Sequence, residues 1–360
     1  MLIGIDASRA NMTQKTGTEW YSYFLIEEFK KIDLDNRFVL YSKNQLEGEL
    51  GNTPSNFENK ILSWPLGFFW TQIRLCWEVF FYPPEVFFIP AHTIPIFTRA
   101  RTVMTVHDVG FKVYPELYKW YDILYHRFSI WWASRFADQI IVPSEFTKTE
   151  LIKYYRTDSK KITVIPHGAS LPPPGGGEVA RKGGEIEPFL LYIGRLEKKK
   201  NILNIIKAFN IILNHYPDFK LVLAGRRGNE MEKINELIES LRLREKIEVL
   251  DYILEEKKVN LYKKASTFVF PTLYEGFGMP ILEAQSYGCP VVTSNRGANA
   301  EVAGESAVLV DPDKPDEIAK GIERALVGER GGFIEKGFEN VKKYSWRQSA
   351  EKTLNVLLKK

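Results

Sequence analysis

Short apolar segments alternate with stretches of helical periodicity along almost all of the 360 residues. Most of the short segments are continuously apolar, as expected of strands buried on both faces of a parallel sheet. This alternation predicts right-handed βαβ units and doubly wound parallel sheets. The expected strands are 2–7, 37–41, 86–90, 102–106, 139–142 and 162–165 in the first half, and 189–193, 220–224, 247–250, 267–270, 290–293 and 307–310 in the second, with helices such as 202–214 and 230–241 between them.

A seam rich in proline and glycine divides the chain. Residues 172–177 are three prolines followed by three glycines, a run that can continue neither a helix nor a central strand. We therefore expect an N-terminal domain over 1–170, a linker over 171–187 and a second domain beyond it, which agrees with a prior of roughly 150 residues per domain. Because parallel sheets bind ligands beyond the carboxyl ends of their strands, we expect a ligand cleft between the two domains.

Charge and cysteine content exclude several classes of protein. The chain has 49 basic and 45 acidic residues, which is not the strongly basic footprint of a nucleic-acid binder. Its two cysteines, Cys76 and Cys289, match neither a disulfide framework nor a zinc spacing, so a reducing, cytoplasmic compartment is expected. The segment 1–6 resembles a first strand more than a signal peptide. The longest apolar stretches fall short of the roughly 20 residues that span a bilayer.

The common nucleotide and hydrolase motifs are missing. No G-x-G-x-x-G follows a strand, and there is neither a P-loop nor a G-x-S-x-G elbow. The aspartate pairs at 33 and 35 and at 311 and 313 stand in turn-like or helix-end contexts, so no metal site is expected there. The chemistry must then come from other segments at the strand ends.

The first such segment, 192–201, directly follows the first strand of the second half. Gly194 allows a sharp turn, and Arg195 and Lys200 can clamp a diphosphate with a guanidinium fork and a point charge. Asn201 is expected to cap the helix that follows. The alternative is a solvated basic loop with no ligand.

The second segment, 271–284, carries two carboxylates around a glycine-containing loop. Gly278 permits a tight turn, and Pro280 suits the first position of a helix. Glu275 precedes the loop and Glu283 lies about one turn into the helix, so both can face one ligand and accept hydrogen bonds from sugar hydroxyls. An acid favoured by the helix dipole would explain Glu283 alone, but not the whole loop.

A third segment places His107 and Asp108 at the end of a strand in the first half. A polar pair at the carboxyl end of a parallel strand points towards the expected cleft. A purely structural histidine is the alternative at this position.

Together these segments resemble the retaining glycosyltransferases of family 4, which have the GT-B fold of two facing Rossmann-like domains. The resemblance covers essentially the whole chain. Glu275 to Glu283 matches the family's E-x7-E signature, and Gly194-Arg195 with Lys200 matches its donor-phosphate clamp. Residues 142–147 and 164–168 are similar to further family segments. By this resemblance the C-terminal domain covers 188–343, and 344–360 forms a last helix that crosses back to the N-terminal domain.

The resemblance implies a role for each matching residue. Arg195 and Lys200 would neutralise the donor diphosphate and the charge that grows on it as the leaving group departs. Glu275 would orient the transferred sugar, and Glu283 would hold the nucleotide ribose. The remaining implied contacts are those of His107, Phe277, Gly278 and Met279 with the sugar, of Gly17 with the diphosphate, and of Gly225 and Tyr252 with the base region.

The sequence also departs from the family pattern. The loop 11–18, which contains Gly17, is longer and more polar than the usual glycine-rich turn. Asp251, beside Tyr252, stands where glycine is common.

The reaction implied by the resemblance is front-face transfer of a hexose with retention, without a metal or cofactor. The donor is a nucleotide sugar. GDP-mannose is favoured because residues 107–116 look most like mannosyltransferase members, and a UDP-sugar stays open. The acceptor is a glycan or a lipid-linked acceptor, as in the synthesis of cell-envelope polysaccharides. A sugar-nucleotide epimerase of GT-B-like fold and a non-catalytic sugar-binding homologue are the alternatives.

Aromatic residues are concentrated in the N-terminal half. Residues 1–170 hold 32 of the 48 aromatics. Residues 119–136 look like an amphipathic helix with Trp120, Leu124, Phe128 and Trp131 at helical spacing. Either this surface meets a lipid-linked acceptor or the inner membrane face, or the aromatic stripe is the buried side of a core helix.

Overall fold

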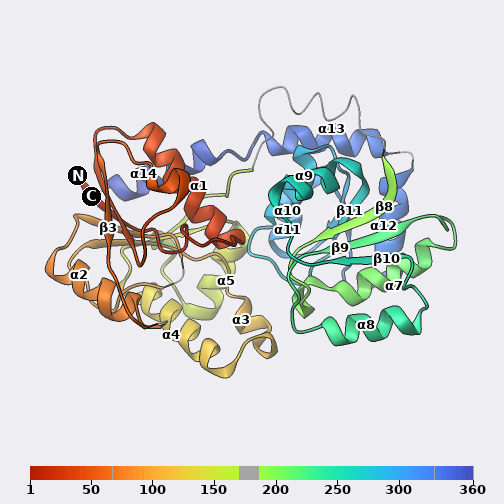
Figure 1. Cartoon of the computed structure of the whole chain (residues 1–360), viewed down its shortest axis with the longest axis horizontal. Helices are drawn as coiled ribbons and strands as arrows, with labels where there is room; N and C mark the ends of the chain where they lie inside the picture. Colours follow the sequence, from red (N-terminus) through yellow and green to blue (C-terminus); the bar gives the residue numbers. More distant parts are fainter. Residues whose placement is uncertain (67, 92, 170–185, 328, 360) are drawn as a thin grey trace. The chain divides into compact units, whose positions relative to one another are not determined.

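The computed structural model of the chain describes residues 1–66, 68–91, 93–169, 186–327 and 329–359 (Figure 1). The chain divides into two compact units, Met1–Gly168 with Ser345–Lys360, and Ala169–Tyr344. We refer to these as the N-terminal and C-terminal domains. The expected linker over 171–187 lies outside the described residues up to residue 185.

The N-terminal domain is built on a seven-stranded parallel sheet in the order β3-β2-β1-β4-β5-β6-β7. The six expected strands are confirmed, with ends that shift by at most one residue. A seventh strand, β3, was not expected and extends one edge of the sheet beside β2. The strands are β1 (Leu2–Asp6), β2 (Arg37–Ser42), β3 (Phe57–Ile61), β4 (Val86–Ile89), β5 (Arg101–Thr105), β6 (Gln139–Val142) and β7 (Ile162–Val164).

Helices cover this sheet, and the last helix of the chain is one of them. Helix α14 packs on α1, where the rings of Phe24 and Trp346 stack with centroids 5.0 Å apart. The Arg101 guanidinium also donates to the carbonyls of Val356 and Leu357 at 3.0 and 2.8 Å. The helices are α1 (Gly17–Ile32), α2 (Cys76–Phe81), α3 (Gly110–Val113), α4 (Trp120–Phe136), α5 (Glu145–Tyr155) and α14 (Trp346–Leu358), with a π-helical turn, η2 (Thr71–Leu75), before α2.

Helix α4 forms where helical periodicity predicts it, but its aromatic stripe faces outward. Its buried residues are small or aliphatic, among them Ser129, Ile130 and Ala133. Trp120 is 72% exposed, and Leu124, Phe128 and Trp131 are also exposed. The alternative of an aromatic stripe buried in the core is therefore wrong.

The C-terminal domain has a six-stranded parallel sheet in the order β10-β9-β8-β11-β12-β13. All six expected strands are confirmed. They are β8 (Glu187–Ile193), β9 (Lys220–Ala224), β10 (Ile247–Leu250), β11 (Ala265–Phe270), β12 (Val291–Ser294) and β13 (Val308–Val310). The helices are α7 (Ile202–Ile212), α8 (Met231–Ser240), α9 (Glu255–Lys264), α10 (Met279–Ser286), α11 (Gly297–Ala303), α12 (Pro315–Leu326) and α13 (Arg330–Val341).

The strand order places a topological switch point in each sheet. In the C-terminal domain the chain runs outward from β8 to β9 and β10, then returns to β11 on the other side of β8. The chain therefore leaves β8 and β11 towards opposite sides of the sheet, and parallel α/β sheets bind ligands at the carboxyl ends of such strands. In the N-terminal domain β1 and β4 have the same relationship.

Candidate active site

The loops that follow β8 and β11 are joined by an ion pair between Lys200 and Glu275. The two side chains are only 14% and 15% exposed, so each charge depends on the other for much of its stabilisation. Lys200 Nζ also lies 5.5 Å from the ring centroid of Phe270, the last residue of β11. A backbone bond of 2.8 Å from Leu273 N–H to the Lys199 carbonyl fixes the same two loops. The structure therefore brings two of the expected site residues together at the switch point.

Arg195 lies in the same loop but extends into solvent. Its side chain is 56% exposed, and Nη1 lies 3.8 Å from the Glu197 carboxylate. An exposed pair at this distance holds the guanidinium weakly. Most of its five N–H donors thus remain available to an anion.

Asn201 does not cap the helix as expected. It occupies the residue before α7 with φ 64° and ψ 34°, and its side chain makes no capping bond. The side-chain amide instead donates to the carbonyls of Pro271 and Pro312, at 3.0 and 2.6 Å. Asn201 thereby ties the loop after β8 to the loops after β11 and β13.

Gly225 follows β9 and has φ +142°. A Cβ at this position would lie 2.1 Å from the carbonyl oxygen of Gly194. Close approach of two backbones explains the glycine. Tyr252, which follows β10, is partly exposed, and the Arg226 guanidinium lies 5.4 Å from its ring centroid. Both positions therefore lie at the carboxyl edge of the sheet, as the loop after β8 does.

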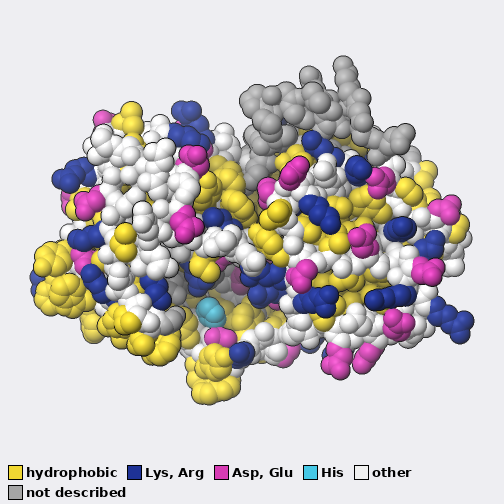
Figure 2. All heavy atoms as spheres, in the orientation of Figure 1, with side chains coloured by type: hydrophobic (Ala, Val, Ile, Leu, Met, Phe, Trp, Pro, Cys, Tyr) yellow, Lys and Arg dark blue, Asp and Glu magenta, His cyan; other side chains and the backbone are white. Residues whose placement is uncertain are grey.

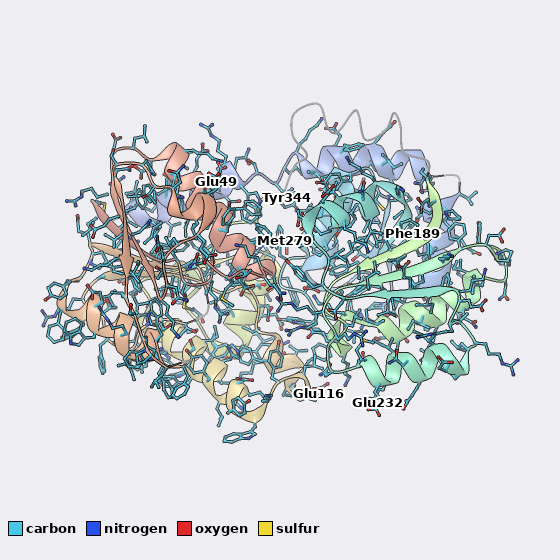
Figure 3. All side chains as sticks on the ribbon, viewed as in Figure 1. Glu49, Glu116, Phe189, Glu232, Met279 and Tyr344 are labelled. Atoms are coloured by element: carbon cyan, nitrogen blue, oxygen red, sulfur yellow. The ribbon has the colours of Figure 1, made fainter. Side chains whose placement is uncertain are left out.

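The loop before α10 is held in a conformation that requires glycine. Gly278 has φ +99°, and a Cβ there would lie 2.8 Å from Oδ1 of Asn299. Phe277 is buried against Tyr344 with ring centroids 5.8 Å apart. Met279 packs against the same cluster and lies near Tyr344 in Figure 3. Helix α10 begins at Met279, so Pro280 is its second residue and not its first.

Asn299 of α11 is a site residue that sequence reasoning missed. Its amide group donates to the hydroxyls of Thr272 and Ser294, at 2.7 and 3.1 Å. Its buried Oδ1 has no hydrogen-bond partner within the described parts of the chain. That oxygen faces the Gly278 backbone, so Asn299 supports the loop that carries the expected sugar contacts.

Glu283 is held by two side chains of α9. Lys258 Nζ lies 3.1 Å from Oε1, and the Tyr262 hydroxyl donates to Oε2 at 3.1 Å. Burial alone would lower the pKa of Lys258, but the carboxylates of Glu283 and Glu255 outweigh it and raise that pKa above its ordinary value. Burial, followed by the Glu283 charge, raises the pKa of Tyr262 well above its ordinary value. Both groups are therefore protonated donors to this carboxylate at neutral pH.

Sequence motifs did not identify Lys258 or Tyr262, although their spacing of four residues on one helix was a usable signal. The two carboxylates of the expected signature therefore have separate partners. Glu275 pairs with Lys200, and Glu283 pairs with α9.

Two expected site residues belong to the N-terminal domain. His107 follows β5 and is buried, with Nε2 2.9 Å from the Pro90 carbonyl. Burial lowers the pKa of His107, so the imidazole is neutral at pH 7. Gly17 was expected in the loop after the first strand, but it is the first residue of α1. The helix begins there because the backbone N–H and the hydroxyl of Thr16 both donate to the Glu19 carboxylate.

Two parallel-sheet α/β domains, the second with a cationic and acidic cluster at its switch point, have the architecture of the GT-B fold. The solved structure of sucrose-phosphate synthase from Thermosynechococcus elongatus superposes with a TM-score of 0.77 at 18% identity, over 99% of this chain and 98% of that chain. The structure of Anabaena Alr3699/HepE in complex with UDP and glucose has a TM-score of 0.74 at 17% identity, over 99% and 98%.

The family follows from the sequence comparisons. The family described as Glycosyltransferase Family 4 matches residues 42–171, and the one described as Glycosyl transferases group 1 matches residues 180–340. O-antigen chain mannosyltransferase B of Escherichia coli is 29% identical over 297 residues, which cover 79% of this chain and 76% of the relative. The chain belongs to glycosyltransferase family 4. Among the described helices, none is long and apolar enough to cross a membrane.

Proposed function

We propose that this enzyme transfers a hexose, with retention, from a nucleotide sugar to a glycan or lipid-linked acceptor. The observation that carries the proposal is the Lys200–Glu275 ion pair beside the exposed Arg195, at the switch point of the C-terminal sheet. A diphosphate needs cations and a sugar needs hydrogen-bond acceptors, and this pair supplies one of each. The similarity to O-antigen chain mannosyltransferase B supports mannose, and the HepE complex with UDP and glucose supports a nucleotide sugar.

In the proposed reaction, donor binding rearranges the ion pair. The diphosphate replaces Glu275 as the partner of Lys200, and Arg195 closes on the same anion. Glu275 is then released to accept hydrogen bonds from hydroxyls of the sugar. Glu283, oriented by Lys258 and Tyr262, accepts hydrogen bonds from the ribose.

In the chemical step, the bond between the anomeric carbon and the diphosphate breaks. The acceptor oxygen bonds to that carbon on the same face, and its proton passes to the departing phosphate oxygen. Arg195 and Lys200 stabilise the negative charge that develops on the leaving group, so no metal ion is required. His107, neutral at pH 7, contacts the sugar as a hydrogen-bonding group and not as a cation.

The test compares Glu275→Ala and Arg195→Ala with the wild type and with Glu236→Ala, a control on the exposed face of α8. Thermal shifts with GDP-mannose and UDP-sugars first identify the donor, because a ligand of the native state raises its melting temperature. Each site variant should lower the rate of transfer by about a hundredfold or more. In the absence of donor, Arg195→Ala should melt near the control because Arg195 is exposed. Glu275→Ala should melt lower, with a single cooperative transition, because it leaves Lys200 without its counter-charge. Wild-type turnover in either site variant would refute the assignment.

We propose in addition that the exposed aromatic side chains of α2 and α4 contact a membrane surface. Figure 2 shows hydrophobic side chains gathered over these two helices. Trp77, Phe81 and Trp120 are exposed there, and Lys119 and Arg127 stand among the aromatics of α4. Aromatic side chains with interspersed cations suit an anionic lipid interface.

A flotation assay with anionic vesicles tests this contact. The wild type should float, and the double variant Trp120→Ser, Leu124→Ser should stay at the bottom. Leu34→Ser is the matched control, because Leu34 is equally exposed but lies outside both helices. A wild type that does not float with vesicles rich in anionic lipid excludes the membrane contact.

A further inference from the structure

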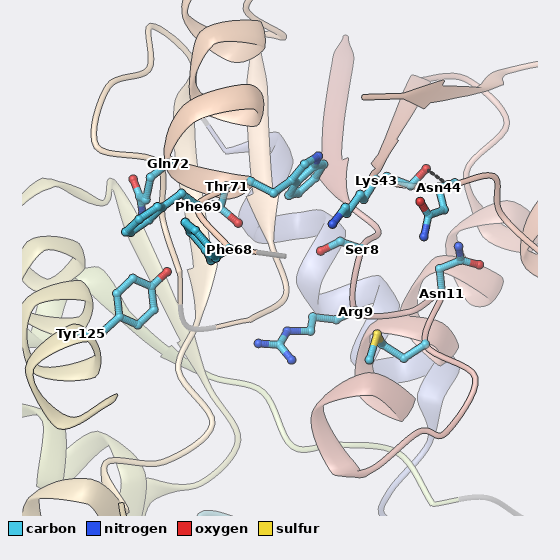
Figure 4. Close-up of a pocket in the computed structure, with 13 residues that line it drawn as sticks. Ser8, Arg9, Asn11, Lys43, Asn44, Phe68, Phe69, Thr71, Gln72 and Tyr125 are labelled. Carbon is cyan, nitrogen blue, oxygen red and sulfur yellow. Dashed lines mark hydrogen bonds between the residues drawn. The ribbon is translucent and has the colours of Figure 1, made fainter. Parts of the chain in front are cut away.

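A cavity of about 360 Å³ opens in the N-terminal domain, outside the candidate active site (Figure 4). Its walls are the loops after β1 and β2, residues 68–72, and Tyr125 of α4. The first two walls leave the sheet at the carboxyl ends of their strands, next to the β1–β4 switch point, where parallel sheets bind ligands. We call this cavity the Arg9–Lys43 pocket.

The charge of this pocket has one sign. Arg9 and Lys43 are two of its thirteen lining residues, and none of the thirteen is acidic. Lys43 Nζ donates to the Leu66 carbonyl at 2.8 Å, which uses one of its three donors. Arg9 is 55% exposed and reaches Glu19 only at 3.5 Å, so its guanidinium is loosely held. The pocket therefore has N–H donors and positive charge to offer to an anion.

The facing wall is aromatic. In Figure 4 the charged ends of Arg9 and Lys43 extend towards the ring of Phe68. Phe68 and Phe69 are both exposed, and their rings meet edge to face at 5.1 Å. Phe69 has φ +61°, a conformation that a bulky side chain adopts at an energetic cost and that is concentrated at functional sites. An exposed aromatic wall offers a flat apolar face to the C–H groups of a sugar ring.

Polar side chains complete the lining. Ser8, Asn44 and Thr71 add hydroxyl and amide groups to the lining. A phosphate alone would use the cations but not the aromatic wall, and a neutral sugar would use the aromatic wall but not the positive charge of Arg9 and Lys43. A sugar that carries a phosphate uses both walls.

We propose that the Arg9–Lys43 pocket binds the acceptor of the transferase through a phosphorylated sugar. This inference rests on the proposed function, because it assigns the pocket to the acceptor side of the reaction. The phosphate would sit between Arg9 and Lys43, and the sugar ring would lie against Phe68. The phosphate can belong to a free sugar phosphate or to the link between a sugar and a lipid carrier, and the chemistry of recognition is the same.

Binding of phosphorylated sugars in the absence of the nucleotide-sugar donor tests the proposal. Calorimetric titrations of the full chain use mannose 1-phosphate, mannose and inorganic phosphate as probes. In a parallel arm the protein is floated with phosphatidylcholine vesicles with or without a polyprenyl-diphosphate-linked monosaccharide. Each site variant should bind its phosphorylated sugar about tenfold more weakly than the wild type. The site variants are Arg9→Ala and Asn44→Asp, of which the second adds a negative charge at nearly constant shape.

The matched control is Arg37→Ala. Arg37 is an exposed arginine, as Arg9 is, but it begins β2 at the amino end of the strand, whereas Lys43 follows the carboxyl end. The Arg37→Ala protein should bind every probe as the wild type does. Binding of mannose 1-phosphate supports a free sugar phosphate, and binding only to vesicles with the linked sugar supports the lipid carrier.

Three results would overturn the proposal: no binding of either phosphorylated sugar, equal binding of mannose or of inorganic phosphate, or binding that neither Arg9→Ala nor Asn44→Asp weakens. Donor binding is measured on the same proteins by thermal shift. If neither phosphorylated sugar binds while the nucleotide sugar still does, this inference alone is refuted. If the wild type neither binds a nucleotide sugar nor transfers from one, the proposed function is refuted.

Discussion

Gly225→Ala should destabilise the C-terminal domain strongly, because two independent effects act at this position. Gly225 has φ +142°, and holding a residue with a side chain in such a region costs about 1–3 kcal/mol. The new Cβ would also lie 2.1 Å from the Gly194 carbonyl oxygen, so the ends of β8 and β9 must separate by about 1 Å to reach a tolerable contact. Overpacking of this kind costs a further 1–3 kcal/mol or so. We expect the free energy of unfolding of this domain to fall by about 3 kcal/mol or more.

The distribution of tryptophan allows the two domains to be followed separately. All eight tryptophans lie within Met1–Gly168 and Ser345–Lys360, so their fluorescence reports on the N-terminal domain. Circular dichroism reports on the helices of both domains. The free energy of unfolding falls by about 1–3 kcal/mol per molar urea, so a loss of about 3 kcal/mol lowers the midpoint of the C-terminal domain by about 1–3 M. The share of the dichroism signal that comes from this domain should shift accordingly. The fluorescence transition should move much less.

Gly332→Ala is the matched control. Gly332 lies in α13, and a Cβ there would meet no atom of the described residues within 4 Å. Replacing a helical glycine with alanine should stabilise the domain by roughly 0.5–1 kcal/mol. A Gly225→Ala protein whose dichroism midpoint stays within about 0.3 M of the wild type would refute the reasoning from backbone proximity.

Three further predictions concern buried polar groups. Burial lowers the pKa of His107 and, still further, that of His167, so below about pH 6.5 the unfolded chain binds protons that the folded chain does not. The free energy of unfolding should be highest above about pH 7 and fall on acidification by up to about 1.4 kcal/mol per pH unit for each histidine. Urea titrations at several pH values should show this slope, and the slope should be smaller in His167→Gln. Tyr262→Phe removes the hydroxyl that holds Glu283 and should raise the KM for the nucleotide sugar several-fold with little change in kcat. Ser144→Ala removes the side-chain cap of α5, whose bond to the Thr147 N–H is 3.1 Å, and should lower the free energy of unfolding by about 1 kcal/mol in a fluorescence-monitored titration.

Most of the sheets could be predicted because their strands are buried on both faces and appear as continuous apolar runs. The strand that was missed, β3, shows the limit of that signal. Its sequence is Phe-Glu-Asn-Lys-Ile, and only Phe57 is buried. An edge strand of this composition forms because β2 offers it a row of backbone partners, which is a tertiary effect that a local pattern does not encode.

Helix α4 shows a related limit. Periodicity predicts a helix but does not say which side faces the core. Large aromatics were the natural candidates for burial, yet the buried residues of α4 include Ser129, Ile130 and Ala133. Small residues allow a helix to lie close to its neighbours, and the aromatics are left on the outside, where the proposed membrane contact uses them.

The sequence predicted where the residues of the candidate site lie, but not which side chains contact them. Arg195, Lys200 and Glu275 follow strand ends, so the topology of a parallel sheet places them at one edge. The partners of Glu283 come from α9, which precedes it in the chain by about twenty residues and carries no recognisable motif. Asn201 has the residue type of a helix cap, but the neighbouring carbonyls of Pro271 and Pro312 compete for its amide. Contacts of this kind depend on how distant segments pack, which spacing in the sequence does not reveal.

The Lys200–Glu275 pair gives the proposed mechanism a source of selectivity. A bare diphosphate that takes Lys200 leaves the Glu275 carboxylate, which is only 15% exposed, without its counter-charge. Leaving a poorly solvated carboxylate unpaired is unfavourable, so the pair opposes binding of the anion alone. A nucleotide sugar returns hydroxyl donors to Glu275 in the same step and avoids that loss. The ion pair of the free protein should therefore favour the complete donor over its nucleoside diphosphate product, which would assist product release after transfer.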